Sequence, residues 1–397
     1  MTGQNIRPDI CIGIDATNLR QGGGITHLAE LLNELKPEEL GISRVVLWAG
    51  SAMNARLPNF PWLIKETPSA LEGSLARRSF WQLFSLSRCA RKAHCDVLFV
   101  PGGSYLGSFS PVVTMSQNLL PFEFTELKRS GISLFTLKML ILRLVQSFTF
   151  GRSDGVIFLT DYARSVVLRV TGKIRGLTCV IGHGVSKNFY SEPKAQQSIK
   201  EYSVTNPFQI IYVSTVDAYK HQLPVIEAMQ VLRGRGHPVK LTMIGSAAKH
   251  SLHLVNKVLE GQDSSHSTTL NLRDEYLGVI PYEKLLDHYR QSDLAVFASS
   301  CETFGIILAE KMLAGLPIAC SQMSCMDEIL QDGGVYFNPL DPDSIANSID
   351  QYLLSPQLRE ENIKKSQRRA LEFTWAISAR QTFEFIVKVV KTQRGQL

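Results

Sequence analysis

The sequence has no paired cysteines and no cluster of metal ligands. Its seven cysteines are odd in number and scattered, none belongs to a Cys-x-x-Cys pair, and no histidine stands at the spacing of a zinc ligand. A disulfide framework is therefore excluded. We expect a reducing compartment, no metal and no cofactor.

The sequence also lacks a strong charge excess, a leader-like start and a long unbroken apolar run. Lys and Arg number 42 against 36 Asp and Glu, and the formal charge of +6 is too small to indicate nucleic acid binding. Polar residues precede the first hydrophobic stretch, so we expect no signal peptide. The most apolar segment, 132–150, contains Lys138 and Arg143, and we expect that it does not span a membrane.

The composition is that of an ordinary globular protein, with 44% apolar and 20% charged residues. The length of 397 residues favours two domains. Short apolar runs bounded by turn residues alternate with helical patterns. This alternation predicts buried parallel strands in doubly wound α/β sheets. The predicted strands are 10–14, 45–49, 96–100, 111–115 and 155–159, and then 209–215, 238–245, 274–280, 293–299, 316–321 and 333–338.

A polar segment, residues 191–207, separates the two sets of strands and is the best candidate for a linker. We therefore predict an N-terminal Rossmann-like domain over 1–195 and a C-terminal one over 206–373, facing each other across a cleft. Ligands of open α/β sheets bind at the carboxyl ends of the strands, so the chemistry should lie in strand-to-helix loops.

One such loop, within residues 299–321, follows the predicted strand 293–299. Thr303 is the expected N-cap of a helix over 304–314, and Gly315 stands after its C-terminus. Gly305 lets a ligand approach the backbone closely, so this helix start suits an anion such as a phosphate.

Two carboxylates accompany this loop. Glu302 precedes the helix, and Glu310 lies within it among apolar residues, where an ionised group needs a donor partner. Taken alone, Glu302 can equally be a solvated loop residue and Glu310 a surface residue of an amphipathic helix.

The stretch E-T-F-G-I-I-L-A-E, residues 302–310, resembles the E-x7-E signature of retaining glycosyltransferase family 4, which has the GT-B fold. The preceding YLGVIPYEKLLDHYRQSDLAVFASS and the following MDEILQDGGVYFNPLDPDSIANSI resemble that family's flanking segments, so the likeness covers about 150 residues. It is fainter in the first half, at QGGGITHLAELL and CVIGHGVSKNFY.

The resemblance implies roles for particular residues. The first Glu of the signature lies at the transferred sugar, the following backbone contacts sugar and diphosphate, and the second Glu binds the ribose hydroxyls. These positions are Glu302, Thr303, Phe304, Gly305 and Glu310. The family's diphosphate-binding Lys corresponds to Lys220; the Arg often found before it is missing, and His221 can assist. The structural alternative is that Lys220 only caps the next helix.

In the first domain, Gly22, Gly23 and Gly24 precede a predicted helix and can let a phosphate or sugar approach, or can form an ordinary turn. They do not form a dinucleotide fingerprint. Where the family often has a His that contacts the sugar, this chain has Gln117, which leaves that contact open.

Three other features have structural interpretations. His27 and His183 are expected to be structural or solvent-facing, and Asp341-Pro342-Asp343 is expected to cap a helix rather than bind a metal. Residues 374–397 form an amphipathic helix, and the resemblance implies that it crosses back to the first domain. The basic amphipathic stretches 74–92 and 128–152 either lie on an anionic membrane surface or pack on the core with a solvated basic side.

The resemblance thus implies a retaining hexosyltransferase that binds a nucleotide diphosphate sugar, with Glu302 and Lys220 at the reaction centre, and the lack of a convincing metal-binding carboxylate pair predicts that it is metal-independent. We favour an enzyme of surface polysaccharide assembly that uses a mannosyl donor and a glycan or lipid-linked acceptor. We expect it to be cytoplasmic, with peripheral membrane contact. A sugar-nucleotide epimerase, a glycogen- or starch-synthase-like enzyme and a non-catalytic nucleotide-sugar-binding protein are the alternatives.

Overall fold

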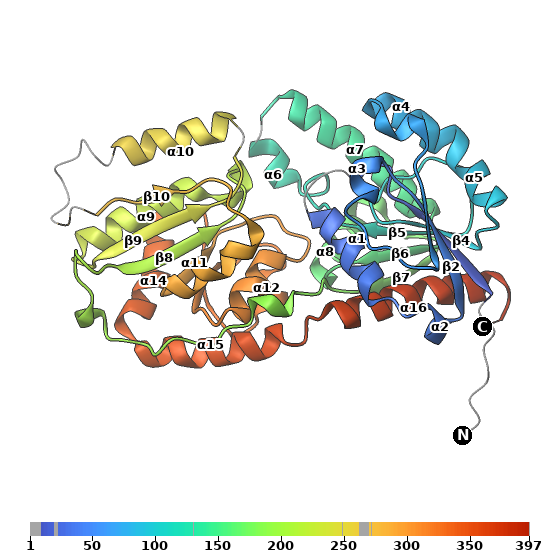
Figure 1. Ribbon diagram of the computed structural model, residues 1–397. Helices are drawn as coiled ribbons and strands as arrows, with labels where there is room; N and C mark the ends of the chain where they lie inside the picture. The colour runs from blue at the N-terminus through green and yellow to red at the C-terminus, as the bar shows by residue number, and fades with distance from the viewer. Residues whose placement is uncertain are drawn as a thin grey trace, which may run out of the picture. The chain divides into compact units, whose positions relative to one another are not determined.

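The computed structural model describes residues 9–19, 23–129, 131–247, 249–261, 270 and 272–396 (Figure 1). The chain forms two compact units. The first comprises Met1–Leu127, Gly131–Gly184 and Trp375–Leu397, and the second comprises Lys128–Ser130 and Val185–Thr374.

The first unit is built on a parallel sheet with the order β3-β2-β1-β4-β5-β6-β7. Its order reverses between β1 and β4, as in a doubly wound fold. The strands are β1 Ile10–Asp15, β2 Ile42–Trp48, β3 Leu63–Glu66, β4 Val97–Val100, β5 Val112–Ser116, β6 Gly155–Phe158 and β7 Leu177–Val180. The helices are α1 Gly23–Glu34, α2 Pro37–Leu40, α3 Ser51–Asn54, α4 Leu75–Trp81, a π-helical turn Gln82–Leu86, α5 Ser87–Lys92, α7 Leu134–Arg152, α8 Asp161–Thr171, α16 Trp375–Gln393 and, at the boundary of the units, α6 Phe124–Arg129.

The second unit has a parallel sheet of order β10-β9-β8-β11-β12-β13, which reverses between β8 and β11. Its strands are β8 Phe208–Val213, β9 Val239–Ile244, β10 Glu275–Tyr276, β11 Leu294–Phe297, β12 Ile318–Ser321 and β13 Val335–Phe337. Its helices are α9 Gln222–Gly234, α10 Lys249–Gly261, α11 Leu285–Gln291, α12 Ile306–Leu313, α13 Met326–Leu330, α14 Pro342–Leu354 and α15 Pro356–Ala370. Two Rossmann-like units confirm the predicted fold class.

The central strands are buried along their whole length, which is why they were visible as continuous apolar runs. β3 and β7 were not predicted. Both lie at the edges of their sheet, and their residues are only partly buried, so their sequences carry no apolar run.

The polar segment 191–207 is not the linker that its composition predicted, because it belongs to the second unit, whose boundary is Gly184 and Val185. The segment is held by side chains of α15. Arg359 donates from Nε to Oε1 of Gln196 at 2.8 Å, and Gln367 donates to the carbonyl of Ser191 at 2.8 Å. The segment therefore packs on α15 through a side-chain oxygen, of Gln196, and a backbone carbonyl, of Ser191.

The terminal helix α16 belongs to the first unit, where it contacts α1, α2, β4 and β6. Its buried face includes Trp375, Phe383 and Val390. Gly155 at the start of β6 makes room for it, because a Cβ there would lie 2.9 Å from both Phe385 and Val389. The helix is thus an integral layer of the first unit.

Helix α7 is the one helix among the described residues that is long and apolar enough to cross a membrane. Its most apolar 18-residue window has a mean hydropathy of 1.3 and is only 22% buried. Our expectation that this segment does not span a membrane stays a prediction.

Candidate active site in the second unit

The predicted site residues of the second unit gather at the carboxyl ends of β8 and β11, where the strand order reverses. The loop after β8 contains a short 3-10 turn, Ala218–Lys220, and the loop after β11 leads into α12. The carbonyl of Tyr219 accepts hydrogen bonds from the backbone N–H of Ser300 at 2.9 Å and from its hydroxyl at 3.2 Å. The two loops are therefore joined at the position where open α/β sheets bind ligands.

Lys220 and Glu302 form an ion pair across these two loops. The side chain of Lys220 is 9% exposed and that of Glu302 is 18% exposed. Burial is the largest single influence and opposes the charged form of Lys220, but Glu302, Tyr219 and Tyr212 together outweigh it and raise the pKa of the ammonium above its usual value. Glu302 is fixed in turn, because its backbone N–H donates to the hydroxyl of Ser324 at 2.9 Å. The ion pair therefore places two charged groups at the carboxyl ends of β8 and β11.

The start of α12 differs from the prediction. Gly305, not Thr303, is the N-cap, and the helix begins at Ile306. Gly305 adopts a left-handed conformation with φ 83°, which is costly for residues with a Cβ, whereas the nearest atom to such a Cβ would be Met326 Cε at 3.4 Å. Backbone conformation rather than lack of space requires glycine here. Thr303 and Phe304 precede the helix in the same loop as Glu302.

Glu310 lies inside α12 and is 2% exposed. Its Oε1 accepts a hydrogen bond from the Tyr282 hydroxyl at 2.6 Å, while its buried Oε2 has no hydrogen-bond partner among the described residues. Burial raises the pKa of this carboxyl to about 7, against which the Tyr282 hydrogen bond acts. A buried carboxylate oxygen without a donor is costly, so the site fits a ligand that brings one.

Sequence reasoning missed two members of this site. Tyr282, in the 3-10 turn Tyr282–Lys284, carries no spacing signal that links it to Glu310. Lys311 is fully buried, donates to the carbonyl of Val296 at 2.9 Å and lies over the ring of Phe297 at 5.0 Å. Burial lowers the pKa of Lys311 to about 7. The only sequence signal for Lys311 is that it stands beside Glu310 as a second charged residue in an otherwise apolar helix.

His221, which follows Lys220, is also held at this edge. It takes a left-handed conformation with φ 51°, and its Nε2 lies 2.7 Å from the hydroxyl of Ser300. Burial, followed by the charge of Arg129, lowers the pKa of His221 to about 4. The imidazole is therefore neutral near pH 7 and can offer a hydrogen bond but no charge.

The first unit brings together two of its predicted residues. Gly22 lies outside the described residues. Gly23 starts α1, and a Cβ on Gly24 would lie 3.4 Å from Oε1 of Gln117. Gly24 and Gln117 therefore lie together at the carboxyl ends of the strands of the first sheet.

His27 is buried and His183 is half-buried in the first unit, and their Nδ1 atoms lie 2.8 Å apart. Both rings contact the indole of Trp375, at 5.6 and 6.0 Å between centroids. This placement fits the structural role predicted for them. The helix-capping role of Asp341 is confirmed, since its side chain accepts from the backbone N–H of Asp343 at 3.0 Å.

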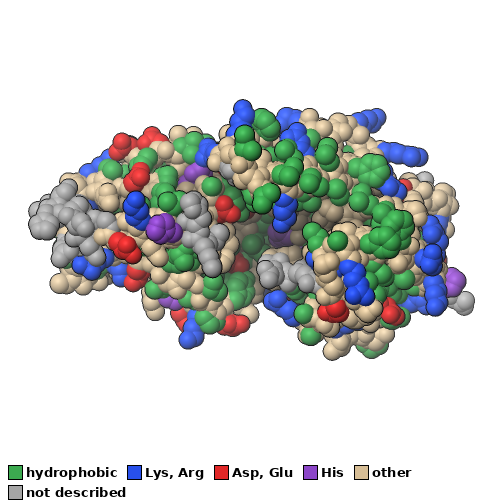
Figure 2. All heavy atoms as spheres, turned by 90° about the horizontal axis from the view of Figure 1, so that it is seen from above, with side chains coloured by type: hydrophobic (Ala, Val, Ile, Leu, Met, Phe, Trp, Pro, Cys, Tyr) green, Lys and Arg blue, Asp and Glu red, His purple; other side chains and the backbone are tan. Residues whose placement is uncertain are grey.

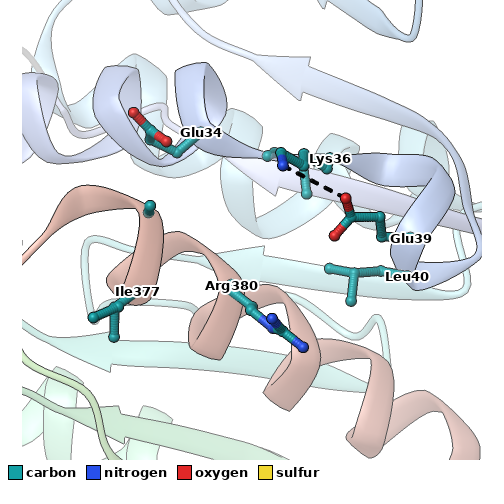
Figure 3. Close-up of a pocket in the computed structure, with 8 residues that line it drawn as sticks. Glu34, Lys36, Glu39, Leu40, Ile377 and Arg380 are labelled. Atoms are coloured by element: carbon teal, nitrogen blue, oxygen red, sulfur yellow. Dashed lines mark ion pairs between the residues drawn. The ribbon is translucent and has the colours of Figure 1, made fainter.

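A separate hollow lies in the first unit between the α1–α2 connection and α16 (Figure 3). Lys36 and Glu39 form an exposed ion pair of 3.5 Å beside it, and Arg380 projects from α16. None of the predicted site residues lines it. We assign no catalytic role to this hollow.

Comparisons with known proteins bear on the second unit and on the fold. Residues 193–369 match the family "Glycosyl transferases group 1". The match contains Lys220, Glu302 and Glu310, and the two-unit fold agrees with solved glycosyltransferases. The matched residues make up less than half of the chain and lie within the second unit, which is therefore similar to the group 1 glycosyltransferases.

Among proteins similar to this chain, the O-antigen chain mannosyltransferase B of Escherichia coli is 33% identical over 107 residues, 27% of this chain and 28% of the relative. Sucrose-phosphate synthase from Thermosynechococcus elongatus has a TM-score of 0.72 at 16% identity, with 97% of this chain and 100% of that one covered. The Anabaena protein HepE in complex with UDP-glucose has a TM-score of 0.67 at 18% identity, covering 98% and 100%. The structural likenesses show the GT-B fold, and the sequence likeness spans less than a third of the mannosyltransferase.

Proposed function

We propose that the protein is a glycosyltransferase that transfers a hexose, with mannose as the first candidate, from a nucleotide diphosphate sugar to a glycan or lipid-linked acceptor, with retention at the anomeric carbon. The observation that carries the donor assignment is the buried Glu310 carboxylate, whose Oε2 has no partner among the described residues. A ribose diol would supply the donor that this oxygen lacks.

The ion pair of Lys220 and Glu302 supports the position of the diphosphate and sugar. The oxygens of a diphosphate carry more negative charge than the single Glu302 carboxylate. A diphosphate that reaches Lys220 can therefore bind its ammonium group, and the lysine can stabilise the departing phosphate. Glu302 then faces the transferred sugar. The backbone at Thr303, Phe304 and Gly305 would add N–H donors to the same group.

Metal independence belongs to the same proposal. Among the residues that the structure describes, no group of three or more His, Cys, Asp or Glu side chains is placed to hold a metal ion. The positive charge that the departing diphosphate requires can come from Lys220, which the pair with Glu302 keeps protonated. No protein nucleophile is needed if the leaving phosphate oxygen assists deprotonation of the acceptor.

The mannosyl donor, surface polysaccharide assembly and a cytoplasmic location with peripheral membrane contact are suggested by the likeness to the O-antigen mannosyltransferase. In the first unit, Gly23, Gly24 and Gln117 are the proposed acceptor or phosphate loop. Gly22 completes that loop in the sequence.

The test is a donor screen on the full chain. Thermal shift with nucleoside diphosphates and their sugars identifies the nucleotide, because a ligand at 100 times its Kd stabilises by about 2.7 kcal/mol. GDP-mannose and UDP-glucose are then assayed for nucleotide release with and without saccharide acceptors, and the anomeric configuration of the product is read by NMR. Release that depends on acceptor with retention supports the proposal. Conversion of the donor to an epimer favours the epimerase, transfer to a glucan primer favours the glycogen- or starch-synthase-like enzyme, and binding without turnover favours a non-catalytic protein.

A further inference from the structure

An apolar stripe runs along the exposed side of α7. Leu134, Leu137, Ile141, Leu144 and Phe148 follow one another at intervals of three and four residues, and each is between 54% and 87% exposed. In a soluble helix this spacing marks the face that packs on the core. Here the stripe faces outward.

The opposite side of α7 is the side that packs. Met139, Gln146, Thr149 and Phe150 are buried, and the Thr149 hydroxyl both accepts from the backbone N–H of Tyr105 at 2.9 Å and donates to its carbonyl at 3.0 Å. At about 1.5 Å per residue the helix is about 28 Å long, close to the thickness of a bilayer core. Because its inner side is an integral part of the unit, α7 can lie on a membrane but cannot cross one without leaving the fold.

The segment of α4 and the turn after it adds to this surface. Phe80 is 66% and Phe84 is 56% exposed, and their ring centroids are 4.5 Å apart. In Figure 1, α4 and α7 lie on the upper face of the first unit. Figure 2 looks onto that face and shows hydrophobic side chains gathered there, with Lys and Arg side chains around them. Isolated exposed apolar residues are normal, but a contiguous patch indicates an interaction surface.

The charge of the two segments identifies the partner. Residues 74–92 contain five Lys or Arg and residues 131–152 contain three, and neither segment contains Asp or Glu. Their combined charge of +8 exceeds the +6 of the whole chain, so the remaining residues sum to −2. Arg88, Lys92 and Lys138 are exposed. The entire positive excess therefore lies in the segments that carry the exposed apolar side chains.

We propose that the surface formed by α4, the turn Gln82–Leu86, α5 and α7 docks onto an anionic lipid bilayer, with the α7 stripe inserted at the level of the headgroups. Apolar side chains enter the interface while flanking Lys and Arg side chains reach the anionic headgroups. A second copy of the chain is a poor occupant, because a symmetric contact would bring two surfaces of the same charge together. The inference does not depend on the sugar or on the transfer reaction.

Cosedimentation of the full chain with vesicles tests the proposal. Vesicles of phosphatidylcholine alone are compared with vesicles of phosphatidylcholine and phosphatidylglycerol. We expect binding to the mixed vesicles at low salt that weakens strongly at about 1 M salt, where the Debye length is about 3 Å. Equal binding to both vesicle types, or no binding to the mixed vesicles, would overturn the proposal.

Matched variants separate the apolar and the charged contributions. Ile141→Glu with Leu144→Glu should weaken binding to mixed vesicles at least tenfold, whereas Leu354→Glu, at an equally exposed leucine of α14, should leave it unchanged. Arg88→Gln with Lys92→Gln and Lys138→Gln should lower binding by about a hundredfold, at about fivefold per charge near the surface. Thermal denaturation shows whether the glutamate variants are folded. If they are not, Ile141→Ser with Leu144→Ser replaces them in the binding assay.

Two results would refute the assignment in favour of another partner. One is undiminished vesicle binding by the variants altered at Ile141 and Leu144. The other is a wild-type dimer in light scattering that these substitutions convert to a monomer, which would assign the stripe to a second copy of the chain.

Discussion

Replacing Glu310 by glutamine tests the donor assignment most sharply, because it changes one charge in a buried site and almost no volume. The Tyr282 hydroxyl, 2.6 Å from Oε1, can still donate to the amide oxygen. What is lost is the charge at Oε2, which has no partner among the described residues. A hydrogen bond to a charged group contributes about 1.5 to 3 kcal/mol and a neutral one about 1, so we expect a donor Kd about tenfold weaker at pH 8.

The same substitution has a pH signature in stability. Burial raises the pKa of the Glu310 carboxyl from 4.5 to about 7, so the folded protein holds this proton more tightly than the unfolded chain does. The contribution to the unfolding free energy is then fully present below pH 4.5 and is lost as the pH rises through 7, which amounts to on the order of 3 kcal/mol. Glutamine cannot titrate. The stability of Glu310→Gln relative to wild type should therefore rise by on the order of 3 kcal/mol between about pH 4.5 and pH 8, whatever constant cost the amide adds.

Calorimetry with a nucleotide diphosphate sugar gives the affinity, and urea unfolding at the two pH values gives the stability difference. The diphosphate of a nucleotide sugar keeps the same charge across this range, so wild-type affinity should fall below pH 7 while that of the variant stays flat. Glu283→Gln, an exposed carboxylate in the same 3-10 turn as Tyr282, is the matched control. Unchanged affinity together with parallel stability profiles of variant and wild type would remove Glu310 from the donor site.

Three further predictions concern the reaction and the terminal helix. Lys220→Met should lower kcat about a hundredfold or more in the nucleotide-release assay, since it removes the cation proposed for the leaving diphosphate; near-normal turnover would reject that role. Transfer should persist in excess chelator, and activity that disappears and returns with added magnesium or manganese would contradict metal independence. Truncation before Phe373 removes α16, whose buried face includes Phe383, Ile386 and Val390, so we expect exposed apolar surface in the first unit and no transfer; a soluble truncated chain with full-length activity would refute this.

The sequence predicted the fold through its buried strands and the site through its spacing. Central strands such as β1 and β11 are apolar along their whole length because both faces of a parallel sheet are covered. Glu302 and Glu310 stood out as carboxylates on either side of a glycine that begins a helix. The start of that helix was misplaced because Thr303 has a good capping side chain, whereas the left-handed backbone of Gly305 decides where α12 begins.

What could not be predicted are the pairings between segments far apart in the chain. Nothing in the spacing of residues 220 and 302 shows that the ammonium of Lys220 reaches the Glu302 carboxylate, or that Tyr282 donates to Glu310. These contacts follow from the order of the strands, because β8 and β11 are neighbours although β9 and β10 lie between them in sequence. The same reasoning explains the polar segment 191–207, whose composition is typical of a linker until Arg359 on α15 is seen to donate to Gln196.

The exposure of α7 shows what a structure adds to an amphipathic pattern. Leu137, Ile141 and Leu144 recur at helical spacing, and from sequence alone this stripe indicates the buried side of a helix. The buried positions are instead Met139, Gln146 and Phe150, on the opposite side. Two of these three are apolar as well, so both sides of α7 offer apolar residues and only packing distinguishes them. Since the outer stripe lies on one of the two segments that together carry the excess of positive charge, the surroundings of α7 favour an anionic membrane over the interior of the protein as the place where that stripe is buried.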